Sequence, residues 1–136
     1  MTKPYVLDAN ALIALIQAGP GFEKVRHILE EALEHRNRIY MSVLNWGEVF
    51  YSLWERRGEE RAREVLANLS RLPIEVVALN LDQIMKAAEI KAVHKVPYAD
   101  SVAAALAVDK KATLVTSDRD FERLGRHFPI LWFARH

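Results

Sequence analysis

Four carboxylates in this chain stand where they could act together: Asp8, Glu48, Asp100 and Asp118. Asp8 and Asp118 each follow a short apolar run that is typical of a buried strand, and Asp100 opens an alanine-rich helical segment. Glu48 lies early in the helix predicted after the apolar run 39–41. Because ligands of a parallel α/β sheet bind beyond the carboxyl ends of its strands, we expect the four acids to meet at that edge.

The chemistry of such a cluster is that of a cation site. Two like charges about 4 Å apart repel by roughly 4 kcal/mol at an effective dielectric constant near 20, so converging acids must shift their pKa values or bind cations. The chain has no cysteine, and its five histidines show no ligand-like spacing, so we interpret the histidines as surface or structural residues. Ligation by oxygen alone suits hard ions, and we expect one or two Mg²⁺ or Mn²⁺ ions.

Helix capping is a simpler explanation for three of the acids. An aspartate before a helix accepts hydrogen bonds from the free N–H groups of the first turn, and Asp8, Asp100 and Asp118 all stand at or near a predicted helix start. Glu48 has no such role, because it lies too deep in its helix. Glu48 therefore carries most of the weight in the argument for a metal site.

The helix that carries Glu48 is predicted to be apolar on two sides. One side gathers Val43, Trp46, Phe50, Leu53 and Trp54. It faces either the core or a protein interface, and its large apolar side chains favour the core. Glu48 projects from nearly the opposite side, in a second apolar strip between Leu44 and Tyr51. A glutamate in such a strip is expected to be partly buried and to need a partner, for which a metal ion is one candidate.

Composition limits the class of protein. The chain of 136 residues is 51% hydrophobic, which predicts one domain over residues 1–136 with a true core. A net charge of +1 argues neither for nor against a nucleic-acid partner. The start of the chain lacks a signal-peptide pattern, and its longest uncharged stretch, residues 9–22, is too short for a membrane span. We therefore expect a cytoplasmic protein with no membrane segment.

Short apolar runs alternate along the chain with longer periodic segments. The expected strands cover residues 5–7, 38–41, 74–77, 113–116 and 130–133, and the expected helices cover residues 10–18, 22–35, 43–56, 59–70, 81–94, 99–109 and 119–125. In the segment 81–94, Leu81, Ile84, Met85 and Ala88 repeat at helical spacing. Strands separated by helices need crossover connections, which predicts an α/β fold with a parallel sheet. We expect the first and fourth strands to be neighbours, which would bring Asp8 beside Asp118.

Four segments around these acids resemble the motifs of PIN-domain nucleases, the fold of the VapC toxins of bacterial and archaeal toxin–antitoxin pairs. Residues 6–15 resemble the opening signature, residues 42–49 the segment with the glutamate, residues 98–107 the third motif and residues 114–121 the fourth. The motifs occur in order and at compatible spacing, and together they cover nearly the whole chain. One departure is the run Asn45-Trp46-Gly47 before Glu48, where a threonine is common.

The resemblance implies a three-layer α/β/α fold whose parallel five-stranded sheet has the order 3-2-1-4-5. It assigns the acidic metal site to Asp8, Glu48, Asp100 and Asp118. Supporting roles fall to Asn10, which matches a position beside the first aspartate, and to three residues of the fourth motif: Thr116, Ser117 and Asp120. Arg119 and Arg123 follow Asp118 closely, and we expect them to hold substrate phosphates.

The implied activity is a Mg²⁺- or Mn²⁺-dependent endoribonuclease that acts as the toxin of a VapBC-type pair. The implied partners are RNA, a second copy of the chain and a small antitoxin that docks on the helical hairpin 43–70. A PIN nuclease of RNA processing and a non-catalytic RNA-binding PIN-like domain are the alternatives. A phosphatase of the haloacid dehalogenase type fits less well, because it needs a second aspartate where this chain has Asn10.

Overall fold

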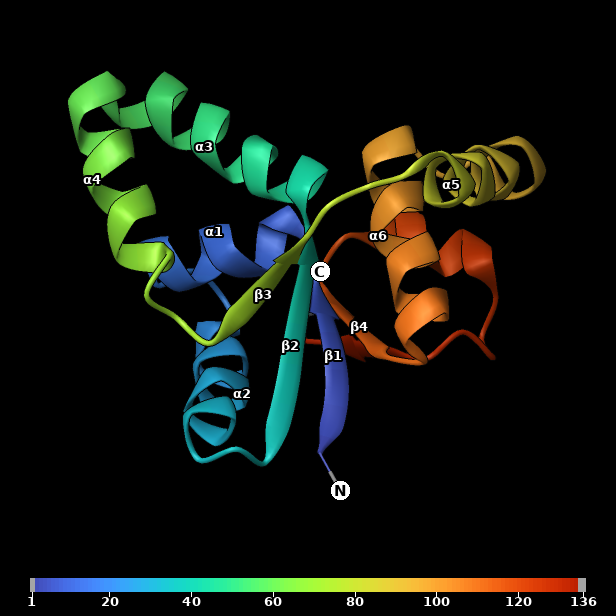
Figure 1. Cartoon of the computed structure of the whole chain (residues 1–136), viewed down its shortest axis with the longest axis horizontal. Coiled ribbons are helices and arrows are strands. Elements are labelled where there is room, and N and C mark those ends of the chain that lie inside the picture. Colours follow the sequence, from blue (N-terminus) through green and yellow to red (C-terminus); the bar gives the residue numbers. More distant parts are fainter. Residues whose placement is uncertain (1, 135–136) are drawn as a thin grey trace.

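The centre of the molecule is a parallel sheet of five strands, seen in a computed structural model that describes residues 2–134 (Figure 1). The sheet order is β3-β2-β1-β4-β5. The strands are β1 (Lys3–Leu7), β2 (Asn37–Ser42), β3 (Ile74–Val77), β4 (Thr113–Thr116) and β5 (Ile130–Trp132). Each neighbouring pair is parallel, and β1 pairs directly with β4. The predicted α/β class, the order 3-2-1-4-5 and the pairing of the first and fourth strands are confirmed.

Helices cover both faces of the sheet. They are α1 (Ala9–Gln17), α2 (Phe22–Leu33), α3 (Val43–Arg57), α4 (Glu59–Leu69), α5 (Leu81–His94) and α6 (Tyr98–Lys110), followed by the 3₁₀ helix η1 (Arg119–Leu124). Helices α1 to α4 lie on one side of the sheet, and α5, α6 and η1 lie on the other (Figure 1). All expected elements are present, with ends shifted by one or two residues, as is usual for helix and strand boundaries. None of the helices in residues 2–134 is long and apolar enough to cross a bilayer.

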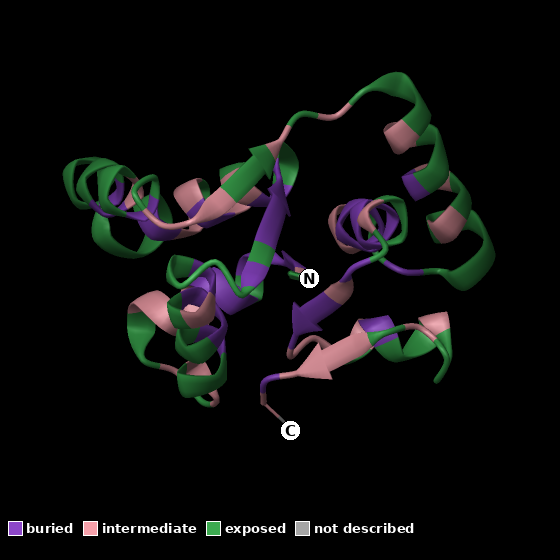
Figure 2. Cartoon of the chain, turned by 60° about the horizontal axis from the view of Figure 1, so that its bottom comes forward, coloured by how far each residue is buried: buried purple, intermediate pink, exposed green. Residues whose placement is uncertain are grey.

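Alternate residues of the central strands serve two separate cores, as the period of a strand requires. Leu7, Met41 and Val115 pack against α1 to α4, whereas Val6 and Leu114 pack against α6 and η1. Helix α6 is buried from Ser101 to Ala107 without interruption, since it lies between the sheet and α5 (Figure 2). Its run of alanines allows this close approach on both sides.

The apolar residues of α3 and α5 are only partly buried. Of the α3 side chains expected to face the core, Leu53 is buried and Trp46 and Phe50 pack against the core, but Val43 is 46% exposed and Trp54 is 42% exposed. Asn45 and Val49 are buried instead. On α5, Leu81 is 74% and Met85 60% exposed, whereas Ile84 packs against the core between α5 and α6. Both helices carry apolar residues on more than one side, so the pattern alone could not say which side would meet the neighbouring helix.

Candidate metal centre

Asp8 lies directly after β1 and is only 3% exposed. One carboxylate oxygen accepts a hydrogen bond from the Ala11 N–H (2.9 Å), which caps α1, and the other accepts one from the Thr116 hydroxyl. The Thr116 oxygen in turn accepts a hydrogen bond from the Asp118 N–H (3.0 Å). Thr116, at the end of β4 and fully buried, therefore ties the ends of two neighbouring strands together.

Three other aspartates converge beside this pair of strand ends. A carboxylate oxygen from each of Asp100, Asp118 and Asp120 lies within 4.8 Å of the other two. Asp118 also caps η1, since it accepts a hydrogen bond from the Asp120 N–H at 2.9 Å. Asp100 sits in the first turn of α6, whose N-cap is Pro97 with no side-chain cap bond. The capping explanation thus applies to Asp8 and Asp118, but it does not apply to Asp100.

Asp120 stands closer to the acids than its predicted supporting role implied. Its carboxylate is one of the three that converge, and it comes from η1 two residues beyond Asp118. The tight 3₁₀ turn folds the side chain back toward the strand ends. The signal in the sequence was the pair of acids at positions 118 and 120. Only the geometry of the turn shows that both carboxylates lie side by side as candidate ligands.

Glu48 approaches from α3, which starts where β2 ends. The carboxylate is half-buried and accepts a hydrogen bond from the Asn45 side-chain amide at 2.7 Å. Asn45 is 1% exposed and donates also to the Ala99 carbonyl (3.2 Å), beside Asp100. Neither Asn45 nor Ser42, which bonds to it, was singled out from the sequence as a site residue. The spacing Ser42, Asn45, Glu48 places all three on one face of a helix and could have indicated them.

The acids influence one another electrostatically. Burial raises the pKa of Asp8 to about 7, and the charges of Asp118 and Glu48 add to the rise, against the hydrogen bonds from Thr116 and Ala11. Burial likewise raises the pKa of Asp100 to about 7, with contributions from the charges of Asp118, Asp8, Glu48 and Asp120. The charges of Asp118 and Glu48 therefore act on both Asp8 and Asp100, as expected when the four predicted acids form a single cluster.

Basic side chains do not neutralise this cluster. Within residues 2–134, no lysine, arginine or histidine nitrogen lies within 4.0 Å of a carboxylate oxygen of Asp8, Glu48, Asp100 or Asp118. Asp120 has Arg123 at 4.0 Å. An acidic cluster without basic partners retains the charge that a cation would compensate.

The remaining predicted residues lie around the acids. Arg123 donates a hydrogen bond to the Lys95 carbonyl at 2.6 Å, while Arg119 pairs with Glu122 at 3.1 Å. A cavity of about 430 Å³ next to Asp118 is lined in part by Asn10, Ser117 and Arg119. Asn10 is exposed in this cavity.

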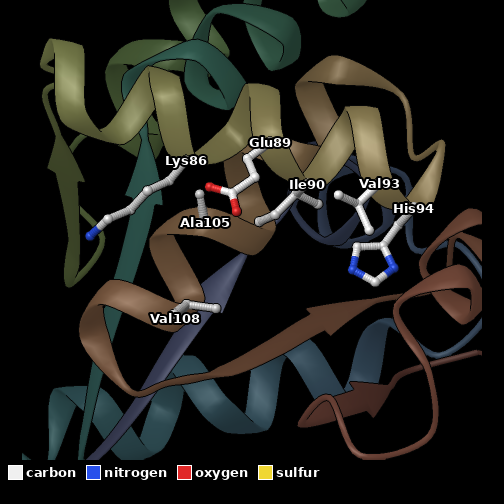
Figure 3. A pocket seen from close by; sticks show the side chains of 7 residues that line it. All are labelled: Lys86, Glu89, Ile90, Val93, His94, Ala105 and Val108. Atoms are coloured by element: carbon white, nitrogen blue, oxygen red, sulfur yellow. The ribbon is translucent and has the colours of Figure 1, made fainter.

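A second hollow, of about 310 Å³, lies between α5 and α6 and contains none of the clustered acids (Figure 3). Its lining is mostly aliphatic, and its titratable groups are Lys86, Glu89 and His94. The acidic edge of the sheet is therefore the stronger candidate for chemistry.

Residues 5–127 match the family model of the PIN domain. The chain belongs to the PIN-domain family. The resemblance predicted from four short motifs is thereby confirmed, and the acids described above occupy the carboxyl edge of a PIN sheet.

Solved structures similar to this PIN domain include toxin–antitoxin complexes and a toxin. VapBC2 of Rickettsia felis, bound to a DNA fragment from its promoter, has a TM-score of 0.76 at 20% identity over 94% of this chain and 97% of that chain. A toxin–antitoxin complex of Klebsiella pneumoniae has a TM-score of 0.70 at 19% identity, over 97% and 99% of the chains. Mycobacterium tuberculosis VapC20, a toxin that cleaves the sarcin–ricin loop, has a TM-score of 0.69 at 19% identity, over 89% of this chain and 95% of that chain. At this identity the likeness shows the fold. No curated protein matches the sequence.

The donor set of this PIN domain fits a hard divalent cation. All candidate ligands are carboxylate oxygens, the ligand type that Mg²⁺ and Mn²⁺ prefer. Oxygens on opposite sides of an octahedral Mg²⁺ ion are about 4 Å apart, given a bond length of about 2.0–2.1 Å. The separation of up to 4.8 Å among Asp100, Asp118 and Asp120 therefore needs only small side-chain rotations to close on one ion.

Proposed function

We propose that this PIN domain is a Mg²⁺- or Mn²⁺-dependent endoribonuclease and the toxin of a VapBC-type toxin–antitoxin pair. The observation that carries the proposal is the cluster of Asp100, Asp118 and Asp120, with Asp8 and Glu48 in electrostatic reach and no basic neutralisation of the four predicted acids within residues 2–134. One or two cations are compatible with this number of carboxylates.

Asp8, Glu48, Asp100 and Asp118 would hold the metal, with Asp120 as a further ligand. A bound divalent cation supplies positive charge against the phosphate and the leaving oxygen. Thr116 orients Asp8 by its hydrogen bond, which keeps that carboxylate aimed past the strand end. Water attacks phosphorus in line and the bond to the 3′-oxygen breaks, which yields a 5′-phosphate and a 3′-hydroxyl.

The surroundings of the acids suit an RNA strand. Arg123 lies beside Asp120, and Arg119 lines the cavity next to Asp118, so both guanidinium groups could hold phosphates that flank the cleaved bond. Asn10 and Ser117 line the same cavity and offer neutral hydrogen-bonding groups. These four residues would position the substrate, while the acids hold the metal.

The role as a toxin is supported by the likeness to VapBC complexes over nearly the full length of both chains. A small antitoxin would dock on the α3–α4 hairpin, where Tyr51 is 53% and Trp54 42% exposed. A cytoplasmic homodimer is part of the same proposal. A PIN nuclease of RNA processing would use the same acids, and an adjacent short reading frame that encodes an antitoxin would separate the two roles.

The test of the activity is an RNase assay on single-stranded and structured RNA with Mg²⁺ or Mn²⁺, followed by excess EDTA. Asp100→Asn is compared with Asp109→Asn, which changes an exposed acid at the other end of the same helix. We expect cleavage by the wild type and by Asp109→Asn, and none after EDTA or with Asp100→Asn. Cleavage that survives EDTA would overturn the metal mechanism, and no cleavage by the wild type would favour the non-catalytic RNA-binding alternative.

A further inference from the structure

We propose that Asn45 is a positioning residue of the metal centre, which holds the Glu48 carboxylate at a set place against the first turn of α6. The inference rests on the proposed metal site and assigns a function to a residue that is not itself an acid. It concerns the part of the chain that departs from the common family motif, the run Asn45-Trp46-Gly47.

The side-chain amide of Asn45 joins two elements that both carry acids. Its nitrogen donates to the Glu48 carboxylate within α3 at 2.7 Å and to the Ala99 carbonyl of α6 at 3.2 Å. Ala99 directly precedes Asp100, which belongs to the converging cluster. One buried amide therefore links a carboxylate on one side of the site to the backbone beside a carboxylate on the other side.

The amide can adopt only one orientation in this network. The Ser42 hydroxyl donates to the Asn45 side-chain oxygen at 2.6 Å, and the Asn45 backbone N–H donates to the same hydroxyl oxygen at 3.0 Å. A flipped amide would turn its oxygen toward the Glu48 carboxylate and the Ala99 carbonyl, which are both acceptors. Ser42 and Asn45 are 0% and 1% exposed, so water does not compete for the two bonds between them.

A neutral donor is the right kind of partner for a carboxylate that must bind a cation. A lysine or arginine would also hold Glu48 still, but its positive charge would offset the negative charge that attracts the metal. The amide restricts a flexible side chain and leaves its charge in place. Groups that orient metal ligands in this way typically change metal affinity by 10- to 100-fold when they are removed.

Asn37 provides a matched control with the same chemistry at the opposite edge of the sheet. It is 8% exposed, and its side-chain nitrogen donates to the Ile28 carbonyl (3.3 Å) and to the Glu31 carboxylate (3.0 Å). It lies at the start of β2, whereas Asn45 follows the end of that strand. A role in stability alone predicts similar behaviour for both residues.

The experiment measures two quantities on the purified full chain: Mn²⁺ affinity by isothermal titration calorimetry, and the unfolding temperature in EDTA. The variants are Asn45→Leu and Asn37→Leu, which remove each amide at similar volume. We expect both to lower the unfolding temperature. Only Asn45→Leu should weaken Mn²⁺ binding, by about tenfold or more, while Asn37→Leu stays within about twofold. Equal Mn²⁺ affinities for Asn45→Leu and the wild type, or an equal loss in Asn37→Leu, would overturn the proposal.

Ser42→Ala keeps Asn45 and removes the group that orients it, so it serves if Asn45→Leu does not fold. We expect a weaker affinity for Mn²⁺ in Ser42→Ala, smaller in size than for the loss of Asn45 itself, and unchanged affinity would count against the proposal. The wild type separates the two levels of inference. If it binds no Mn²⁺, the metal site fails and Asn45 has nothing to position; if it binds Mn²⁺ and the Ser42 and Asn45 variants bind as well, only the role of Asn45 fails.

Discussion

The acids at the two edges of the sheet differ in whether basic side chains lie beside them. At the amino edge, where β2 begins, Glu31 and Glu34 lie 3.6 and 3.3 Å from Arg36, and Glu31 also accepts a hydrogen bond from Asn37. At the carboxyl edge, Asp8 is only 3% exposed, and Asp8, Glu48, Asp100 and Asp118 have no basic side chain within 4.0 Å in residues 2–134; among these clustered acids, Asp120 alone has one, Arg123 at 4.0 Å. A fold under selection for stability alone would neutralise the buried acids first. The contrast supports the proposal that the carboxyl edge carries the function.

The largest expected effect comes from Asp8→Asn at the carboxyl edge, compared with Glu31→Gln at the amino edge. Removal of the Asp8 charge should lower RNA cleavage by at least about 100-fold, a loss typical of a group that acts on transition-state charge. The metal-free variant should be as stable as the wild type or more stable, because a buried charge is gone. Glu31→Gln should do the reverse and keep full activity at somewhat lower stability. Cleavage rates and unfolding temperatures measure both effects, and an active Asp8→Asn protein would refute the comparison.

A smaller effect is expected from Thr116→Val, compared with Thr113→Val at the other end of β4. Thr116 donates to Asp8 and accepts from the Asp118 N–H, so its loss should loosen two acids at once. We expect a loss of about tenfold in Mn²⁺ affinity, in the range usual for residues that orient metal ligands. Thr113 lies at the amino edge, and its variant should bind Mn²⁺ as the wild type does. Calorimetric titrations of both variants decide the point.

The pH dependence of stability tests the acids of the carboxyl edge without a mutation. The pKa values of Asp8 and Asp100 are raised to about 7 in the folded protein, above the ordinary 3.8 of an unfolded aspartate. The stability that these two carboxyls contribute to the folded protein is fully present below pH 3.8 and is lost as the pH rises through about 7. The metal-free protein should therefore lose at least about 1–2 kcal/mol of unfolding free energy between pH 5 and pH 8, with allowance for screening at the less buried Asp100.

Urea unfolding in EDTA across this pH range measures the loss. Mn²⁺ should restore stability at pH 8, because a cation that binds only the folded form stabilises it by mass action. The same titration of Asp8→Asn should show a shallower pH dependence. A slope of the opposite sign in the wild type would show that the two carboxyls are not held as acids of raised pKa.

The smallest effect is expected from the arginines. Arg123→Gln should weaken RNA binding a few-fold and lower the slope of log affinity against log salt by about one, as the loss of one phosphate contact does. Arg38→Gln, at the amino edge, removes an arginine that pairs with Glu75 and should leave both quantities unchanged. Binding is measured in the Asp8→Asn background, where the RNA stays intact. Equal salt slopes for the two variants would place Arg123 outside the RNA path.

Local patterns in the sequence determined most of the fold and the acids that matter. The apolar runs ending at Leu7 and Thr116 and the periodic segments between them predicted the strands and helices, since these depend on residues close in the chain. The positions of Asp8 and Asp118 after two strands then predicted that they converge, whereas the full sheet order came from the resemblance to PIN domains. These features survive without knowledge of packing, because a parallel sheet places every strand end on the same edge.

Only the tertiary structure decided how the acids are supported. On α3, contacts with other elements bury Asn45, Val49 and Leu53, of which only Leu53 belongs to the side that was expected to face the core. The bond from Asn45 to Ala99 joins residues 54 positions apart, which no local pattern encodes. Asp120 entered the cluster because η1 is a tight turn. The acids could thus be predicted from the sequence. The residues that hydrogen-bond to them depend on which helices meet, and long-range packing decides that.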